Sequence, residues 1–120
     1  MVLSKVTVVI DVADPEASAG FWEQALGYRR RPSAGDSPYV SIERAGDVDG
    51  PPEVTFQRVP EPKEGKVRVH LDLFVDHALP LVSDLTTAGA TLVTVQEAGE
   101  WTTRVLQDPD GTEFCIVGPD

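Results

Sequence analysis

The chain has 120 residues, 41% of them hydrophobic and 25% charged, which is ordinary for a single globular domain. Its formal net charge of −10 repels phosphate backbones and argues against a nucleic-acid partner. No apolar run reaches the roughly 18 residues that a membrane span needs, and no signal peptide follows Met1. Cys115 is the single cysteine, so no internal disulfide can form, and we expect a cytoplasmic protein.

The first half of the sequence predicts a strand, a helix and three further strands. The helix is predicted to begin after Asp14, which is a favoured N-cap, with Pro15 at its first position. Gly27 is predicted to end it as a left-handed cap. Alternating or β-rich runs predict the strands, at residues 6–12, 28–31, 39–43 and 53–59.

The second half predicts the same order of elements. Asp76 is the expected N-cap of its helix, and Gly89 is expected to end it. Pro80 is compatible with this helix only in the first turn, so the helix is expected to start late. The strands are predicted at residues 67–75, 91–96, 101–107 and 113–117.

The order β-α-β-β-β therefore occurs twice, with a period of about 60 residues. We predict an α+β fold in one domain, in which each repeat forms a four-stranded sheet with a helix on one face. Side by side, the two sheets would form a half-open, curled surface that suits a small ligand. The predicted divisions are a domain over 1–120, with repeats at about 1–60 and 67–120 and a connector at 60–66.

The strand that opens the second repeat carries the residues of greatest chemical interest. Its apolar side chains alternate with polar ones, which places His70 between Arg68 and Asp72 on the polar face. A nearby carboxylate can fix the tautomer of an imidazole and raise its basicity, so His70 is a candidate general base. The alternative is a polar histidine that is satisfied by neighbouring strands.

Several segments resemble the vicinal oxygen chelate superfamily, which includes glyoxalase I, bleomycin-resistance proteins and extradiol dioxygenases, and most closely its small bacterial glyoxalase-like branch. The resemblance covers nearly the whole chain. It implies the paired-repeat fold and a homodimer, but this fold supports many reactions and also non-catalytic binding. The segments that carry it are Asp14-Pro15-Glu16, Phe21-Trp22, Leu26-Gly27, Val69-His70-Leu71-Asp72 and Asp108-Pro109-Asp110-Gly111.

In metal-dependent members the resemblance implies four ligands, two from each repeat, usually His or Gln, Glu, His and Glu. The matching positions here are Thr7, Gln57, His70 and Cys115. Aligning the two repeats matches Gln57 to Cys115, and Thr55 lies one inward step away on the same strand. Thr and Gln are neutral, weak ligands, and none of the four positions carries a carboxylate. We therefore expect no cofactor. The less favoured alternative is a divalent metal, since His70 and Cys115 are both zinc ligands.

The sequence thus predicts a protein that binds a small organic molecule in a concave cup. The first alternative is a lyase, isomerase or dioxygenase-type enzyme that uses His70 as ligand or acid/base. The second is a dimeric interaction module without a ligand. The expected ligand-binding residues are Thr7, Tyr39, Gln57, His70, Trp101 and Cys115.

Three features of the sequence have more than one interpretation. Tyr39 and Trp101 can stack on a flat ligand or form a dimer contact. Cys115 can act as a nucleophile if His70 lies near it, although a small buried hydrophobic residue is the favoured interpretation. The basic run Arg29–Arg31 can attract an anion, but a solvated, protected edge strand is favoured.

Overall fold

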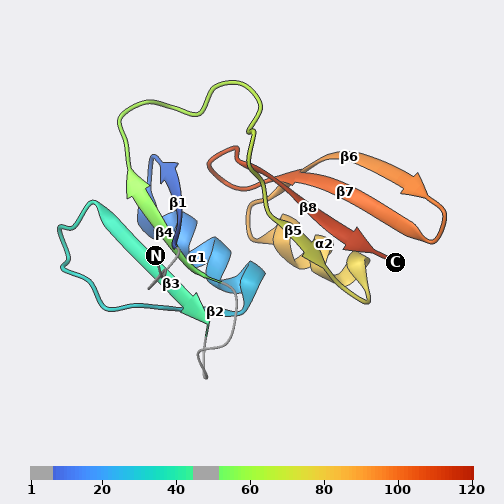
Figure 1. The fold of residues 1–120 in the computed structure, drawn as a ribbon, viewed down its shortest axis with the longest axis horizontal. Coiled ribbons are helices and arrows are strands. Elements are labelled where there is room, and N and C mark those ends of the chain that lie inside the picture. Colours follow the sequence, from blue (N-terminus) through green and yellow to red (C-terminus); the bar gives the residue numbers. More distant parts are fainter. Residues whose placement is uncertain (1–6, 45–51) are drawn as a thin grey trace, which may run out of the picture. The chain divides into compact units, whose positions relative to one another are not determined.

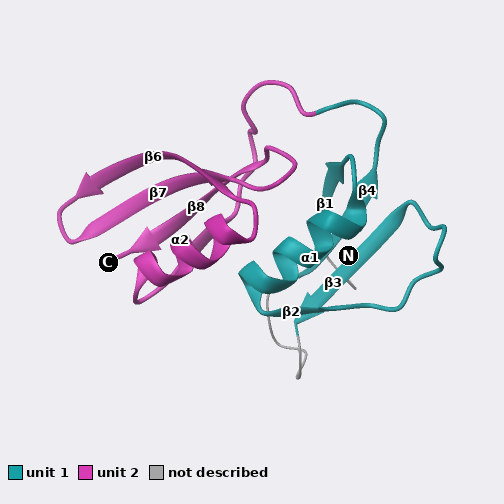
Figure 2. Ribbon diagram, turned by 180° about the vertical axis from the view of Figure 1, so that it is seen from behind, with its two compact units in different colours: residues 1–62 teal, residues 63–120 magenta. Residues whose placement is uncertain are grey.

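The computed structural model describes residues 7–44 and 52–120, and the chain divides into two compact units, Met1–Pro62 and Lys63–Asp120 (Figures 1 and 2). The predicted order of elements is confirmed in both units. Residue 6 of the first predicted strand lies outside the described residues. Within the described ranges, no helix is long and apolar enough to cross a membrane.

The first unit is a four-stranded sheet with one helix. Its elements are β1 (Thr7–Val12), α1 (Pro15–Leu26), β2 (Tyr28–Arg30), β3 (Tyr39–Arg44) and β4 (Glu53–Arg58). The strand order is β1-β4-β3-β2, and β1 runs parallel to β4.

Both predicted caps of α1 are confirmed. The backbone N–H of Ala17 donates to Asp14 Oδ1 at 3.2 Å, and Gly27 ends the helix with φ of 67°. Phe21 and Trp22 are buried on the inner side of this helix, and their rings meet edge to face with centroids 5.4 Å apart. The local sequence therefore determines both the ends of α1 and the face that it buries.

The second unit repeats the arrangement. Its elements are β5 (Asp72–Phe74), α2 (Ala78–Thr87), β6 (Thr91–Ala98), β7 (Trp101–Gln107) and β8 (Glu113–Gly118). The strand order β5-β8-β7-β6 matches that of the first sheet, again with the first and last strands of the unit parallel.

The predicted N-cap of α2 is wrong. His77, not Asp76, occupies that position, and its side chain makes no capping hydrogen bond. Instead, the backbone N–H of Ala78 donates to the carbonyl oxygen of Pro119 at 2.8 Å. The end of the chain thus supplies the acceptor that a local side chain would otherwise provide. Pro80 does lie in the first turn, as predicted.

The predicted strand over 67–75 is also too long, because only β5 (Asp72–Phe74) forms. In the parallel register Asp72 lies opposite Cys115, so residue 68 would lie opposite Gly111. Gly111 belongs to the turn that precedes β8, where its N–H donates to the carbonyl oxygen of Asp108. The earlier residues therefore have no partner strand, and Val69 is 81% exposed instead of facing the core.

Each helix covers one face of its own sheet (Figure 1), and the hydrophobic core of each unit lies between them. The core side chains alternate along the strands, as a half-buried sheet requires. On the strands they are Val12, Val40, Ile42, Val54 and Phe56 in the first unit, and Leu106, Phe114 and Ile116 in the second, while Leu85 is buried on α2. We call the opposite side of each sheet, away from its helix, the open face.

Candidate functional site

Three chemically reactive side chains meet on the second unit's open face: His70, Asp72 and Cys115. Asp72 and Cys115 are direct partners in the parallel ladder of β5 and β8, so their side chains project from the same face. His70 Nδ1 lies 2.8 Å from Asp72 Oδ1. One ligand atom from each residue lies within 4.8 Å of the others.

The environment of Cys115 opposes ionisation of its thiol. Burial raises the pKa of Cys115, and the negative charge of Asp72 and a hydrogen bond to its carboxylate raise it further. The positive charge of Lys66 acts in the opposite direction but does not outweigh them. Cys115 is also only 9% exposed, so the raised pKa and the burial both disfavour its action as a nucleophile.

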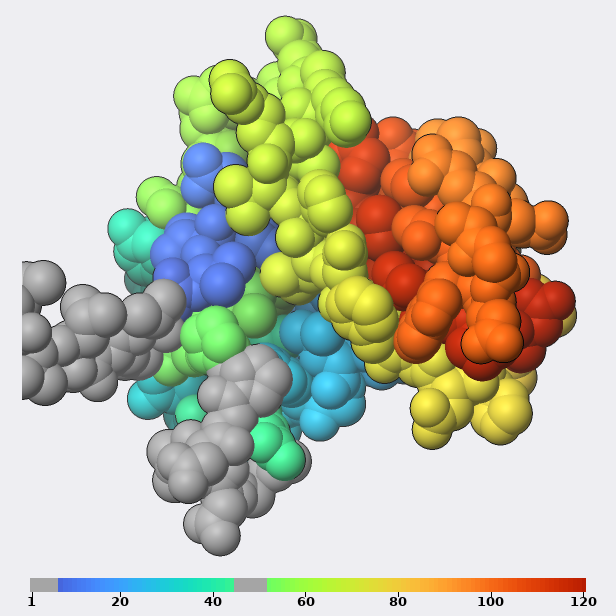
Figure 3. All heavy atoms as spheres, turned by 45° about the vertical axis from the view of Figure 1, so that its right-hand side comes forward, coloured from blue at the N-terminus to red at the C-terminus, as the bar shows by residue number. Residues whose placement is uncertain are grey.

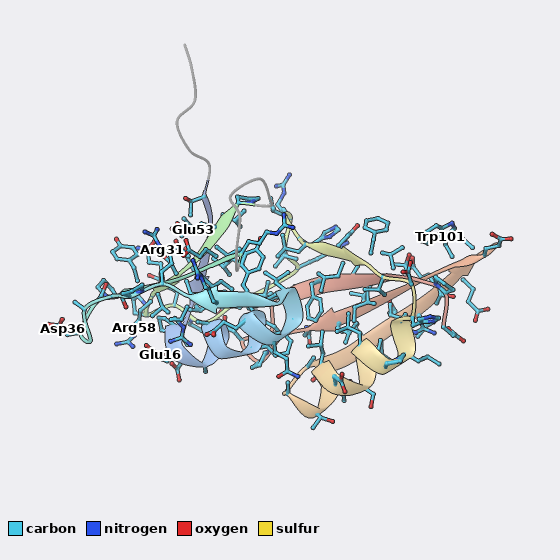
Figure 4. All side chains as sticks on the ribbon, turned by 90° about the horizontal axis from the view of Figure 1, so that it is seen from below. Glu16, Arg31, Asp36, Glu53, Arg58 and Trp101 are labelled. Carbon is cyan, nitrogen blue, oxygen red and sulfur yellow. The ribbon has the colours of Figure 1, made fainter. Side chains whose placement is uncertain are left out.

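An aromatic pair lies on the same open face. Phe74 follows Asp72 by two residues on β5, and its ring meets that of Trp101 edge to face with centroids 6.4 Å apart. Phe74 is 69% exposed and Trp101 is 53% exposed, and Trp101 lies on the side of the sheet away from α2 (Figure 4). The sequence analysis included Trp101 among the ligand-binding residues but missed Phe74. Phe74 lies two residues after Asp72 and four after His70, and this even spacing in an alternating pattern already placed it on the same face.

The other predicted ligand-binding residues lie on the first unit's open face. Tyr39 and Gln57 are direct partners across β3 and β4. Thr7 pairs with Glu53, four positions before Gln57 on β4. Thr7 and Gln57 are therefore about 13 Å apart along the strand direction and cannot contact the same small ion.

The structure also changes the predicted alignment between the repeats. Val9 lies six residues before the start of α1, as Asp72 lies six residues before the start of α2. Their partners are Thr55 and Cys115, so Thr55, not Gln57, corresponds to Cys115. The Thr55 hydroxyl is hydrogen bonded to the Ser41 hydroxyl at 2.8 Å, with 9% of Thr55 exposed.

The family-type metal site implied by the resemblance does not fit these residues. Thr7 and Gln57 are separated along their sheet, and both are neutral oxygen donors. The structurally equivalent Thr55 is also neutral, and its hydroxyl already has a partner. At these positions, all within the described part of the first unit, the side chains are neutral oxygen donors and not the stronger ligands that the resemblance implies for metal-dependent members.

The basic run Arg29–Arg31 is neutralised by acidic side chains. Arg31 Nη1 lies 2.5 Å from Glu53 Oε2, and the two residues lie side by side in Figure 4. The other two arginines also form ion pairs, Arg29 with Glu43 and Arg30 with both Glu16 and Glu23. These pairs agree with the favoured interpretation, a charged and protected edge, and leave little net positive charge to attract an anion.

Solved structures share this architecture over nearly their whole length. A glyoxalase/bleomycin resistance protein/dioxygenase family enzyme from Burkholderia phytofirmans has a TM-score of 0.74 and 23% identity, covering 93% of this chain and 95% of that one. The fosfomycin resistance protein FosX from Listeria monocytogenes, solved with Mn(II) and a dihydroxypropylphosphonic acid, has a TM-score of 0.76 and 12% identity, covering 99% and 93%. A superfamily member from Sphaerobacter thermophilus has a TM-score of 0.69 and 18% identity, covering 98% of both chains.

These similarities define the fold class as glyoxalase/bleomycin resistance, with two βαβββ modules and two four-stranded mixed sheets. The model of the glyoxalase-like domain family matches residues 7–117, so the chain belongs to that family. No curated protein matches the chain.

Proposed function

We propose that this protein binds a small organic molecule on the second unit's open face, without the family-type metal site. The observation that carries the proposal is the exposed Phe74–Trp101 pair beside the polar His70–Asp72 pair. Ligand sites commonly combine aromatic walls with a few fixed polar groups. Structural neighbours of the same fold bind small molecules, as the phosphonic acid complex of FosX illustrates.

The proposed ligand has a flat apolar part and a hydrogen-bonding group. The flat part stacks on Trp101, because aromatic pairs gain about 0.5–1.5 kcal/mol beyond the area that they bury. The polar group meets the imidazole of His70, whose Nδ1 is oriented by Asp72. A reducing cytoplasm suits the single free thiol of Cys115 and is the proposed location.

A thermal-shift screen with planar heteroaromatic compounds tests this proposal. A compound that binds the native state raises the melting temperature by mass action. Trp101→Ala is expected to weaken binding about tenfold, because the stacking surface is lost. The matched control is Leu79→Ala, since Leu79 is similarly exposed but lies on α2. Equal affinity in both variants would contradict the assignment of the open face.

Catalysis by His70 is the second candidate function, and the 2.8 Å contact with Asp72 is the observation that favours it. A carboxylate bound to Nδ1 leaves Nε2 to accept a proton from a bound substrate. Product analysis of each compound found in the screen separates turnover from binding alone.

We also propose that the chain forms a homodimer through β6. All eight residues of this edge strand are exposed, and Leu92, Val93 and Val95 contribute apolar surface, with β6 in orange in Figure 3. Such an edge offers unpaired backbone groups to a second copy, and antiparallel pairing of two identical edges satisfies twofold symmetry.

Val95→Lys is therefore expected to convert a dimer into a monomer, because a charge would enter the centre of the paired edge. Light scattering coupled to size exclusion measures the mass, and Leu79→Lys on α2 serves as the control. A wild-type monomer, or a dimer that Val95→Lys leaves intact, would refute pairing through β6.

A further inference from the structure

We propose that the ligand of the second unit's open face is an organic cation, held between the aromatic pair Phe74–Trp101 and the carboxylate of Asp72. This inference rests on the proposed function and specifies the charge of the molecule that the site accepts. The preferred ligand is a planar aromatic group that carries a positively charged nitrogen.

The stretch of chain that forms this part of the sheet has an uneven distribution of charge. From residue 69 to residue 103 the sequence contains five acidic residues and no lysine or arginine. β5, α2, β6 and the first residues of β7 all come from this stretch. The whole chain also carries a net charge of −10, so the electrostatic potential at this surface favours a cation over an anion.

Carboxylates neighbour both aromatic residues. Asp72 lies two residues before Phe74 on the same face of β5, so the two side chains are about 7 Å apart. Asp76 follows Phe74 by two residues, Glu100 directly precedes Trp101, and both acidic residues are exposed. A molecule that rests on the rings therefore has a carboxylate within reach of its charged end.

The four basic side chains of the second unit lie elsewhere. Three of them precede β5, whereas Phe74 lies at the far end of that strand; these three are Lys63, Lys66 and Arg68. The fourth, Arg104, is buried on the same side of β7 as the core residue Leu106. The carboxylates beside the aromatic pair thus keep their attraction for a cationic ligand.

The carboxylate of Asp72 has room for a further partner. One of its oxygens lies 2.8 Å from His70 Nδ1, and the thiol of Cys115 is hydrogen bonded to the same carboxylate. An ionised carboxylate offers about four acceptor positions, and the side chain of Asp72 is 40% exposed. A cationic N–H donor can therefore reach it without displacing these contacts.

The aromatic rings add an attraction that only a cation gains. The face of an aromatic ring is electrically negative, and a cation within about 6 Å of the ring centre is attracted to it. Both Phe74 and Trp101 are more than half exposed, so ring surface is accessible to a ligand. A neutral or anionic molecule of the same shape would gain the contact area without this attraction.

Three planar compounds of nearly the same shape test the inference: cationic benzamidinium, neutral benzamide and anionic benzoate. Titration of the full-length protein is followed through the two tryptophan indole N–H signals in NMR spectra, where buried Trp22 is the internal control. We expect the Trp101 signal to shift and benzamidinium to bind about tenfold more tightly than benzamide. The ring contact and an exposed charge pair each contribute a few-fold to this preference. Benzoate is expected to bind most weakly.

Two variants separate the carboxylate from the rings. Asp72→Asn keeps the shape of the side chain and is expected to reduce the preference for benzamidinium to about threefold or less. Phe74→Leu keeps the apolar bulk and is also expected to reduce this preference, because an aromatic face is lost. Asp84→Asn is the matched control, since Asp84 is an exposed carboxylate on α2. Circular dichroism establishes that each variant is folded.

Equal affinity for benzamidinium and benzamide, or tighter binding of benzoate, would overturn the inference. A preference that survives in both Asp72→Asn and Phe74→Leu would overturn it too, as would one that Asp84→Asn reduces equally. The proposed function has its own readout. A neutral heteroaromatic compound that loses affinity in Trp101→Ala supports binding on the open face whatever the charge series shows.

Discussion

Gly118→Ala is expected to destabilise the second unit by about 3 kcal/mol or more. Gly118 ends β8 with φ of 152°, which residues with a side chain rarely adopt. A Cβ atom placed there would lie 2.1 Å from the carbonyl oxygen of Val75, well inside any real contact. The obstacle is backbone, so relief would require β8 to separate from the segment that follows β5.

Gly99→Ala is the matched control, because it introduces the same side chain at a positive φ of 65° but with no atom within 4 Å. Its cost is expected to be about 1–2 kcal/mol, from backbone conformation alone. Urea denaturation followed by circular dichroism measures both free energies of unfolding. A Gly118→Ala variant as stable as Gly99→Ala would show that β8 and Val75 are not so close.

Trp22→Ala is expected to lower the free energy of unfolding by about 3–5 kcal/mol. Trp22 is the largest fully buried side chain of the first unit, with 1% of its surface exposed. Its removal leaves a cavity between α1 and the sheet and also eliminates the edge-to-face contact with Phe21.

The other tryptophan in the chain provides the comparison. Trp101 is 53% exposed, so Trp101→Ala is expected to change the free energy of unfolding by less than about 1 kcal/mol while weakening ligand binding. Thermal and urea denaturation of the two variants distinguish the structural tryptophan from the proposed ligand contact. Similar losses of stability would mean that Trp101 packs in the native core.

The features predicted most accurately from the sequence are those that depend on residues close together along the chain. Asp14, Pro15 and Gly27 act within one helix, and their signals were sufficient to place both ends of α1. The repeated order of elements was also predicted correctly, because strands and helices differ in the periodicity of their hydrophobic residues. The predicted alternation is retained within β5, where Asp72 and Phe74 project from one face, whereas His70 lies before the strand begins.

Features that depend on distant residues were harder to predict. The length of β5 is determined by the point at which β8 leaves its turn, some 40 residues later. The correspondence of Cys115 with Thr55 depends on the register of two parallel ladders, which no local pattern reveals. For the same reason, the meeting of Asp72 with Cys115 became visible only in three dimensions.

The start of α2 has a practical consequence for protein engineering. Its first amide is satisfied by the carbonyl of Pro119, and the guanidinium of Arg104 holds Asp120 beside it at 2.5 Å. Shortening the chain before residue 119 would remove the acceptor for the Ala78 amide and the partner of Arg104 together. A recombinant form of this domain should therefore include both Pro119 and Asp120.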